Sequence, residues 1–198
     1  GDKTVKEVCE MNNVDCQTFL VVVNFMAEGF SRMDGSADDI SIPALVDYLR
    51  QAHIYFLDYC LPAIRRKLIE AIDCSQDDVS FLILKFFDGY MREVRKHMEY
   101  EEKTVFKYVD TLIHGNAPKN YQISTFSKHH DQVGERLTEL KNIIIKYCPA
   151  KANTNVLNAA LFDIYACEEG LESHCKVEDY LFVPAILKLE RRMRENEK

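Results

Sequence analysis

The stretch His97-Met-Glu-Tyr-Glu101-Glu-Lys-Thr-Val-Phe106 lies within a long run of helical periodicity and is the starting point for predicting the fold. It places a histidine and a glutamate four residues apart, so both side chains share one helix face about 5–6 Å apart. A second stretch, His174-Cys-Lys-Val-Glu178-Asp-Tyr-Leu-Phe182, repeats the spacing. In both stretches an acidic residue and an apolar-aromatic step follow the glutamate. Each pair can therefore direct an imidazole and a carboxylate at one point.

Four long helical patterns contain these motifs. Pro43, a favoured first-turn residue, opens the first pattern, and Pro62 is expected to kink it. The last pattern ends in a charged tail, 190–198, which is expected to fray. Patterns of this length with short connections predict an all-α protein, an up-down-up-down four-helix bundle. The patterns cover approximately residues 43–72, 75–114, 120–148 and 153–198.

Two shorter helical patterns precede the bundle. The first covers residues 4–11, and the second begins after Asp15, a plausible N-cap. Glycine, serine and aspartate are frequent in residues 33–41, which indicates a linker. We therefore expect residues 1–38 to form a short N-terminal helical segment with its linker, and residues 39–198 to form the bundle.

The composition excludes several classes of protein. A net charge of −7 argues against a nucleic-acid partner. No apolar run approaches the roughly 20 residues that span a bilayer, so no membrane association is expected. The seven cysteines are odd in number and form no C-x-x-C pair, which argues against a disulfide framework and favours a reducing cytoplasm. The oligomeric state is open, and a homodimer is possible.

The remaining helices supply histidines at a matching depth. His53 lies about ten residues into the first pattern and His130 about ten into the third. At about 1.5 Å per residue, an antiparallel bundle brings both to the level of the two histidine–glutamate pairs. Imidazole and carboxylate ligands suit iron or manganese, and such a set can hold two ions. The candidate metal ligands are His53, His97, Glu101, His130, His174 and Glu178.

Two further histidines need separate interpretation. His129 neighbours His130, and the two side chains point about 100° apart, so spacing alone does not decide which one faces the core. His114 stands beside Gly115 at a helix end, where a histidine usually interacts with the helix dipole, so it is not expected to be a ligand. The alternative for the six candidate ligands is that their side chains face solvent or form hydrogen bonds with one another.

The order His53, His97-x-x-x-Glu101, His130-Asp131 and His174-x-x-x-Glu178 resembles the hemerythrin-like (HHE cation-binding) superfamily. Within it, the sequence is most similar to the repair-of-iron-centres (RIC) di-iron proteins of bacteria, also called ScdA or YtfE proteins. The resemblance covers Pro43 to about Leu189. Classical oxygen-carrying hemerythrins use five histidines with one aspartate and one glutamate bridge, and this sequence does not match that set.

The resemblance implies particular roles. The segment Ser127–Gly134 is similar to the H-D-x-x-G segment of the family, which selects His130 over His129. Glu101 and Glu178 would be bridging carboxylates between two iron ions, with four terminal histidines. The stretch Gly1–Cys9 resembles the second half of the family's small N-terminal domain, but the vicinal cysteine pair of that domain does not occur in this chain. His129 replaces the acidic residue usually found before the ligand histidine.

Three functions follow as hypotheses. The resemblance implies a non-haem di-iron protein of nitrosative or oxidative stress defence that repairs damaged iron–sulfur proteins, through iron release or nitric-oxide chemistry. The second hypothesis is a module that binds oxygen reversibly or senses redox state. The third is a metal-free helical interaction protein. The residues themselves predict only a redox-capable two-metal site with room for a small diatomic ligand such as O2 or NO.

Overall fold

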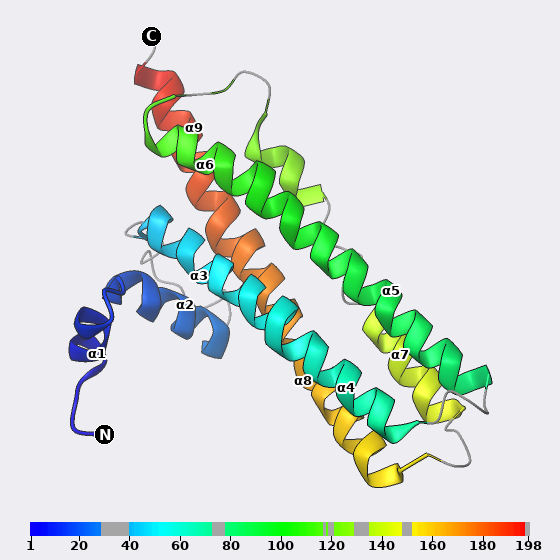
Figure 1. The fold of residues 1–198 in the computed structure, drawn as a ribbon. Helices are drawn as coiled ribbons and strands as arrows, with labels where there is room; N and C mark the ends of the chain where they lie inside the picture. Colours follow the sequence, from blue (N-terminus) through cyan, green and yellow to red (C-terminus); the bar gives the residue numbers. More distant parts are fainter. Residues whose placement is uncertain are drawn as a thin grey trace. The chain divides into compact units, whose positions relative to one another are not determined.

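The computed structural model describes residues 1–28, 40–72, 78–116, 118, 121–128, 135–147 and 152–196 (Figure 1). Throughout these ranges the regular structure is helical, as the sequence predicts. Two compact units make up the chain. Unit 1 comprises residues 1–51, 103–128 and 173–198, and unit 2 comprises residues 52–102 and 129–172.

Both short N-terminal helices are confirmed. Helix α1 spans Val5–Met11 and begins with a capping box, in which Thr4 and Glu7 satisfy each other's free backbone groups. Helix α2 spans Cys16–Glu28. Its predicted N-cap is also confirmed, because the Thr18 amide donates to Oδ1 of Asp15 over 2.8 Å. The Thr18 side chain and amide hold the pKa of Asp15 below its usual value.

The first long pattern forms α3 (Ile42–Ile54), a π-helical turn η3 (Tyr55–Cys60) and α4 (Leu61–Ala71). The break expected at Pro62 takes the form of this π turn, which ends two residues before the proline. The amide of Leu61 donates to the Phe56 carbonyl, five residues back. A wider turn at this place relieves the contact between the proline ring and the carbonyl of the preceding turn.

The second long pattern forms α5 (Asp78–Tyr100), the π turn η4 (Glu101–Val105) and α6 (Phe106–Ile113). His114 is the C-cap, and Gly115 follows with a φ of 82°. The predicted end of this pattern is therefore confirmed. Glycine suits the position because a left-handed backbone conformation strains other residues.

The third long pattern begins differently from the prediction. In place of an α-helix from about residue 120, the structure has the 3₁₀ helix η5 (Ile123–Lys128), and α7 follows at Glu135–Lys146. Ser124 and Thr125 fall in this first stretch. Their side chains compete for backbone hydrogen bonds and disfavour a regular α-helical start.

The fourth long pattern forms α8 (Thr154–Val177), the π turn η7 (Glu178–Phe182) and α9 (Val183–Asn196). The expectation that the tail frays from residue 190 is wrong, since the helix continues to Asn196. Glu190 is the reason. It is 5% exposed and accepts hydrogen bonds from the Tyr108 hydroxyl (2.5 Å) and the Ile123 amide (2.9 Å).

Each unit has its own core. In unit 2, segments of all four long patterns share one buried cluster, to which α4, α5, α7 and α8 contribute. In unit 1, the ring of Phe182 lies 5.8 Å from that of Phe106 and 6.3 Å from that of Phe126, edge to face in both pairs. Four helical segments around one core agree with a bundle, and the up-down-up-down order stays a prediction.

The N-terminal helices also contact the rest of unit 1. The ring of Phe25 in α2 lies 6.0 Å from that of Tyr180 in η7, and the Ser41 amide donates to Oγ1 of Thr18. The division of the chain after residue 38 stays a prediction. None of the described helices combines the length and apolar character that crossing a membrane requires.

Glu190 provides a test of how α9 is held. Replacing it with alanine should lower the free energy of unfolding by about 2–4 kcal/mol, because the buried Tyr108 hydroxyl and Ile123 amide lose their acceptor. Urea denaturation followed by circular dichroism measures the loss. The matched control is Glu195→Ala, on the exposed side of the same helix, which should change stability by less than about 0.5 kcal/mol. Equal losses in the two variants would contradict this role for Glu190.

Candidate metal centre

Glu101 stands at the junction of α5 and η4 and contacts two histidines. Its Oε1 lies 2.8 Å from Nε2 of His97, one turn earlier in the chain. Its Oε2 lies 2.9 Å from Nε2 of His53, near the end of α3. Glu101 is fully buried, and the side chain of His97 is 14% exposed. One carboxylate thus presents each of its oxygens to a different imidazole, and all three groups are residues that the sequence predicted as ligands.

The other ring nitrogen of His53 has a partner of its own. Its Nδ1 lies 3.0 Å from Oε1 of Glu102, the residue after the buried glutamate. The tautomer that donates from Nδ1 to this carboxylate leaves the lone pair of Nε2 facing Glu101. A carboxylate partner of this kind fixes the tautomer and the orientation of a metal-binding histidine. The role of Glu102 was not predicted from the sequence, although the acidic residue after each glutamate was a signal for it.

His174 and Glu178 form the second predicted pair. Nε2 of His174 lies 3.4 Å from Oε1 of Glu178, at the junction of α8 and η7. Both side chains are buried, with His174 3% exposed and Glu178 fully inaccessible. The spacing of four residues therefore brings imidazole and carboxylate together on one helix face, as the sequence predicts.

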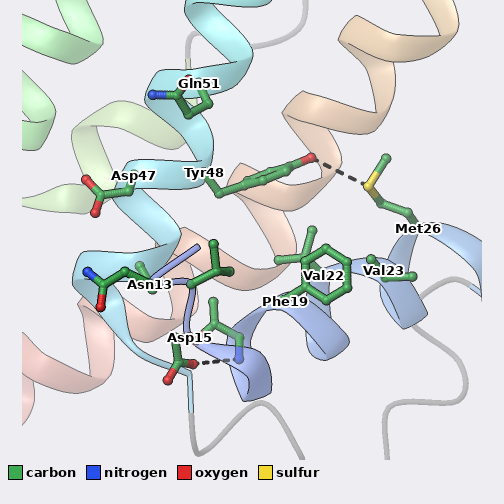
Figure 2. Close-up of a pocket in the computed structure, with 12 residues that line it drawn as sticks. Asn13, Asp15, Phe19, Val22, Val23, Met26, Asp47, Tyr48 and Gln51 are labelled. Atoms are coloured by element: carbon green, nitrogen blue, oxygen red, sulfur yellow. Dashed lines mark hydrogen bonds between the residues drawn. The ribbon is translucent and has the colours of Figure 1, made fainter. Parts of the chain in front are cut away.

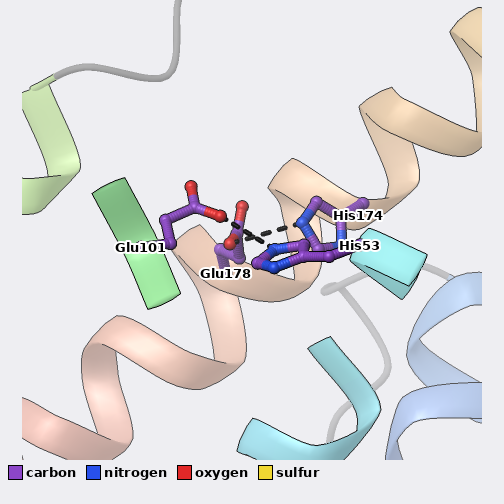
Figure 3. A group of neighbouring side chains, drawn as sticks. All are labelled: His53, Glu101, His174 and Glu178. Atoms are coloured by element: carbon purple, nitrogen blue, oxygen red, sulfur yellow. Dashed lines mark ion pairs between the residues drawn. The ribbon is translucent and has the colours of Figure 1, made fainter. Parts of the chain in front are cut away.

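His53, Glu101, His174 and Glu178 form one group of neighbouring side chains (Figure 3). Each offers a ligand atom, and these atoms all lie within 4.8 Å of one another. Two buried carboxylates so close together repel each other unless positive charge compensates them. Nitrogen and carboxylate oxygen donors together suit first-row transition metals. The burial and chemistry of this donor set therefore fit a bound cation.

A π turn begins at each ligand glutamate. The turn η4 starts at Glu101 and η7 at Glu178, each directly after an H-x-x-x-E pair. Such wide turns occur singly within α-helices, often at functional sites. The two motifs thus share their backbone conformation as well as their spacing, which the sequence pattern did not predict.

Three further histidines occur in the chain. His129 and the predicted ligand His130 fall outside the described residues, so the choice between them stays a prediction. His114 lies at the exposed end of α6, where its Nδ1 is 2.8 Å from the carbonyl oxygen of Asp110. It does not belong to the buried group of Figure 3.

A pocket of about 340 Å³ lies in unit 1 between α2 and α3 (Figure 2). Its walls are mostly apolar and include Phe19 and Val23 of α2. The hydroxyl of Tyr48 on α3 points to Sδ of Met26 across 3.5 Å. Burial, and then the negative charge of Glu178, raise the pKa of Tyr48. Tyr48 therefore links this pocket electrostatically to a candidate ligand. Neither the pocket nor Tyr48 was predicted from the sequence, since a tyrosine five residues before a histidine is no recognised signal.

The comparisons with known proteins agree with this site. The family model of the hemerythrin HHE cation-binding domain matches residues 44–186, well over half of the chain. The match includes both H-x-x-x-E pairs and His53, and the family's description as cation-binding agrees with the donor set. No curated protein and no solved structure matches the chain. The similarity to repair-of-iron-centres proteins within the superfamily stays a prediction. By its match and its buried histidine–glutamate group, the chain belongs to the hemerythrin HHE cation-binding domain family.

Proposed function

We propose that the protein is a non-haem di-iron protein whose ligands are His53, His97, Glu101, His130, His174 and Glu178. The observation that carries the proposal is the environment of Glu101, each of whose oxygens faces a different histidine nitrogen at 2.8 or 2.9 Å. A carboxylate arranged in this way is suited to bridging two ions, with one histidine on each. Glu178 would be the second bridge.

The chain's own residues would set the properties of this site. A bound iron pair would supply one-electron redox chemistry and an affinity for small diatomic molecules. Glu102 orients His53, and the burial of all four residues in Figure 3 excludes bulk water from the ligands. Burial, and then the charge of Glu178, raise the pKa of Tyr48, so this tyrosine holds its proton to higher pH than an ordinary one.

We further propose that the site acts in nitrosative or oxidative stress defence, in the repair of damaged iron–sulfur proteins. The sequence resemblance to repair-of-iron-centres proteins supports this role, and membership of the cation-binding family supports the metal site on which the role depends. None of the cysteines in the described ranges forms a disulfide, which is compatible with a reducing cytoplasm. Reversible oxygen binding and redox sensing are the alternative, and a homodimer stays a possible assembly. A metal-free role is disfavoured by the cost of burying Glu101 and Glu178 without a cation.

Reaction with nitric oxide tests the function. Stopped-flow absorption of the reduced, iron-loaded protein should show a change in the di-iron bands on mixing with nitric oxide, because a site with an open position binds small diatomic ligands. Unchanged bands would contradict nitric-oxide chemistry at this centre. A stable oxygenated form that shows no turnover would favour the alternative, reversible oxygen binding.

Metal content tests the ligand roles in a graded way. We expect about two irons per chain in the wild type and a loss of most of the metal in Glu101→Gln, since an amide is a poor ligand and bridge. Glu102→Gln should weaken metal binding by about 10–100-fold, the usual effect of removing a partner of a ligand histidine. Competition with a chelator and elemental analysis measure both effects.

Glu99→Gln is the matched control for these variants, because Glu99 is exposed and two residues from Glu101 on the same helix. It should retain the metal content of the wild type. Equal metal loss in all three variants would indicate damage to the fold and would contradict a specific role for Glu101.

The third helical pattern needs its own test. His130→Ala should reduce the iron content much more than His129→Ala, because the resemblance implies that only His130 is a ligand. Elemental analysis of the two purified variants compares them directly, and circular dichroism checks that both are folded. Equal losses would show that the choice between the neighbours is wrong.

A further inference from the structure

Two cysteines of unit 2 face one pocket away from the predicted ligands. Cys60 is the last residue of η3 and is partly buried, and Cys167 lies in α8 and is 2% exposed. Both line a pocket of about 280 Å³, together with Tyr55, Tyr59 and Asp163. The two tyrosines are largely exposed, so the pocket opens to solvent on the side of Cys60.

The two helical segments approach each other closely at this place. A side chain added at Gly170, one turn beyond Cys167, would meet the ring of Phe56 at 3.3 Å. Ala63 and Ala166, which also line the pocket, are small neighbours of the two cysteines. Close approach of the two segments that carry the cysteines is a condition for a bond between their sulfur atoms.

The two thiols line the same pocket and are not equivalent. The hydrogen bond from Cys167 is the main reason that the pKa of Cys60 lies below its usual value. The same hydrogen bond, followed by burial, raises the pKa of Cys167. Asp163 opposes ionisation of Cys60, but Lys67 holds this carboxylate at 2.5 Å. Cys60 is therefore the accessible thiol that ionises more readily, with a protonated thiol behind it.

A second pair of cysteines provides an internal comparison. Cys9 and Cys16 of α1 and α2 are also hydrogen-bonded, and again one is buried and the other partly exposed. Here burial is the main cause of the raised pKa of Cys9. Proximity of two thiols is thus a property of both pairs. The pair Cys60 and Cys167 differs in lining a pocket in which Cys60 is accessible and has a lowered pKa.

We propose that Cys60 and Cys167 form a dithiol site that a hydroperoxide oxidises to a disulfide. The Cys60 thiolate attacks the distal peroxide oxygen, the O–O bond breaks, and Cys60 becomes a sulfenic acid while the peroxide leaves as an alcohol, or as water from hydrogen peroxide. Cys167 then attacks the Cys60 sulfur, and the S–OH oxygen leaves as water with the Cys167 proton. Two thiols and one hydroperoxide thus give one disulfide, one alcohol or water, and one further water. A dithiol reductant reverses the change.

The experiment treats reduced, metal-containing protein with equimolar hydrogen peroxide, blocks remaining thiols with iodoacetamide, and digests with trypsin and a glutamate-specific protease. Mass spectrometry should find a crosslink between the peptides of Cys60 and Cys167, in the wild type and in the control Cys16→Ser. In Cys167→Ala, dimedone should label Cys60 as a sulfenic acid. In the reduced protein at neutral pH, Cys60 should also react with iodoacetamide at least about threefold faster than Cys16.

Several outcomes would overturn the proposal. No crosslink in folded wild-type protein would do so, as would equal reaction rates of Cys60 and Cys16. The Glu101→Gln variant, expected to lack metal, should crosslink as fast as the wild type. If it does not, the oxidation originates at the metal and Cys60 is not the group that reacts with peroxide. The proposal stands on the thiol pocket alone, so the absence of iron from the purified protein would leave it intact.

Discussion

The contact of one fully buried carboxylate with two imidazoles sets the strictest condition on this structure. Glu101 can remain inside only if His53 and His97 keep their nitrogens near its two oxygens, and this fixes the end of α3 against the last turn of α5. A shift of either helix by one residue would rotate a ligand by about 100° and leave charge buried without a partner. The cost of that error is several kcal/mol, comparable with the stability of a whole domain. The position of these helices is therefore determined by electrostatics as well as by apolar packing.

Polar groups around the centre extend this condition outward. Glu102 ties the second nitrogen of His53 to the protein surface, and the charge of Glu178 reaches Tyr48 at the wall of the apolar pocket. In unit 1 a third buried glutamate, Glu190, holds α9 through the Tyr108 hydroxyl and the Ile123 amide. Buried carboxylates thus serve two purposes in this chain. Some gather donors suited to a cation, while Glu190 is satisfied by neutral donors and an arginine.

Much of the fold and of the metal centre could be predicted from the sequence. The predictions that failed did so for physical reasons. Helical periodicity predicted the four long runs, and the i, i+4 rule predicted that each H-x-x-x-E pair would meet. The charged composition of the tail suggested fraying. That expectation failed because composition cannot show that Glu190 turns inward to two donors distant in sequence. The contact between Cys60 and Cys167 was equally invisible, since it depends on tertiary packing of segments 107 positions apart. The 3₁₀ start of the third run reflects local competition by hydroxyl side chains, which periodicity does not detect.

The three π turns η3, η4 and η7 change the spacing of buried residues along the long helices. At two of them neighbouring residues are both buried, Val105 and Phe106 in the second run and Leu181 and Phe182 in the fourth. The apolar stripe is therefore offset around the helix at these points. As a result, one continuous helix buries a different face before and after the π turn. A strict seven-residue repeat cannot survive such phase slips. In the first, second and fourth runs, the inward-facing side therefore has to be counted afresh after the π turn.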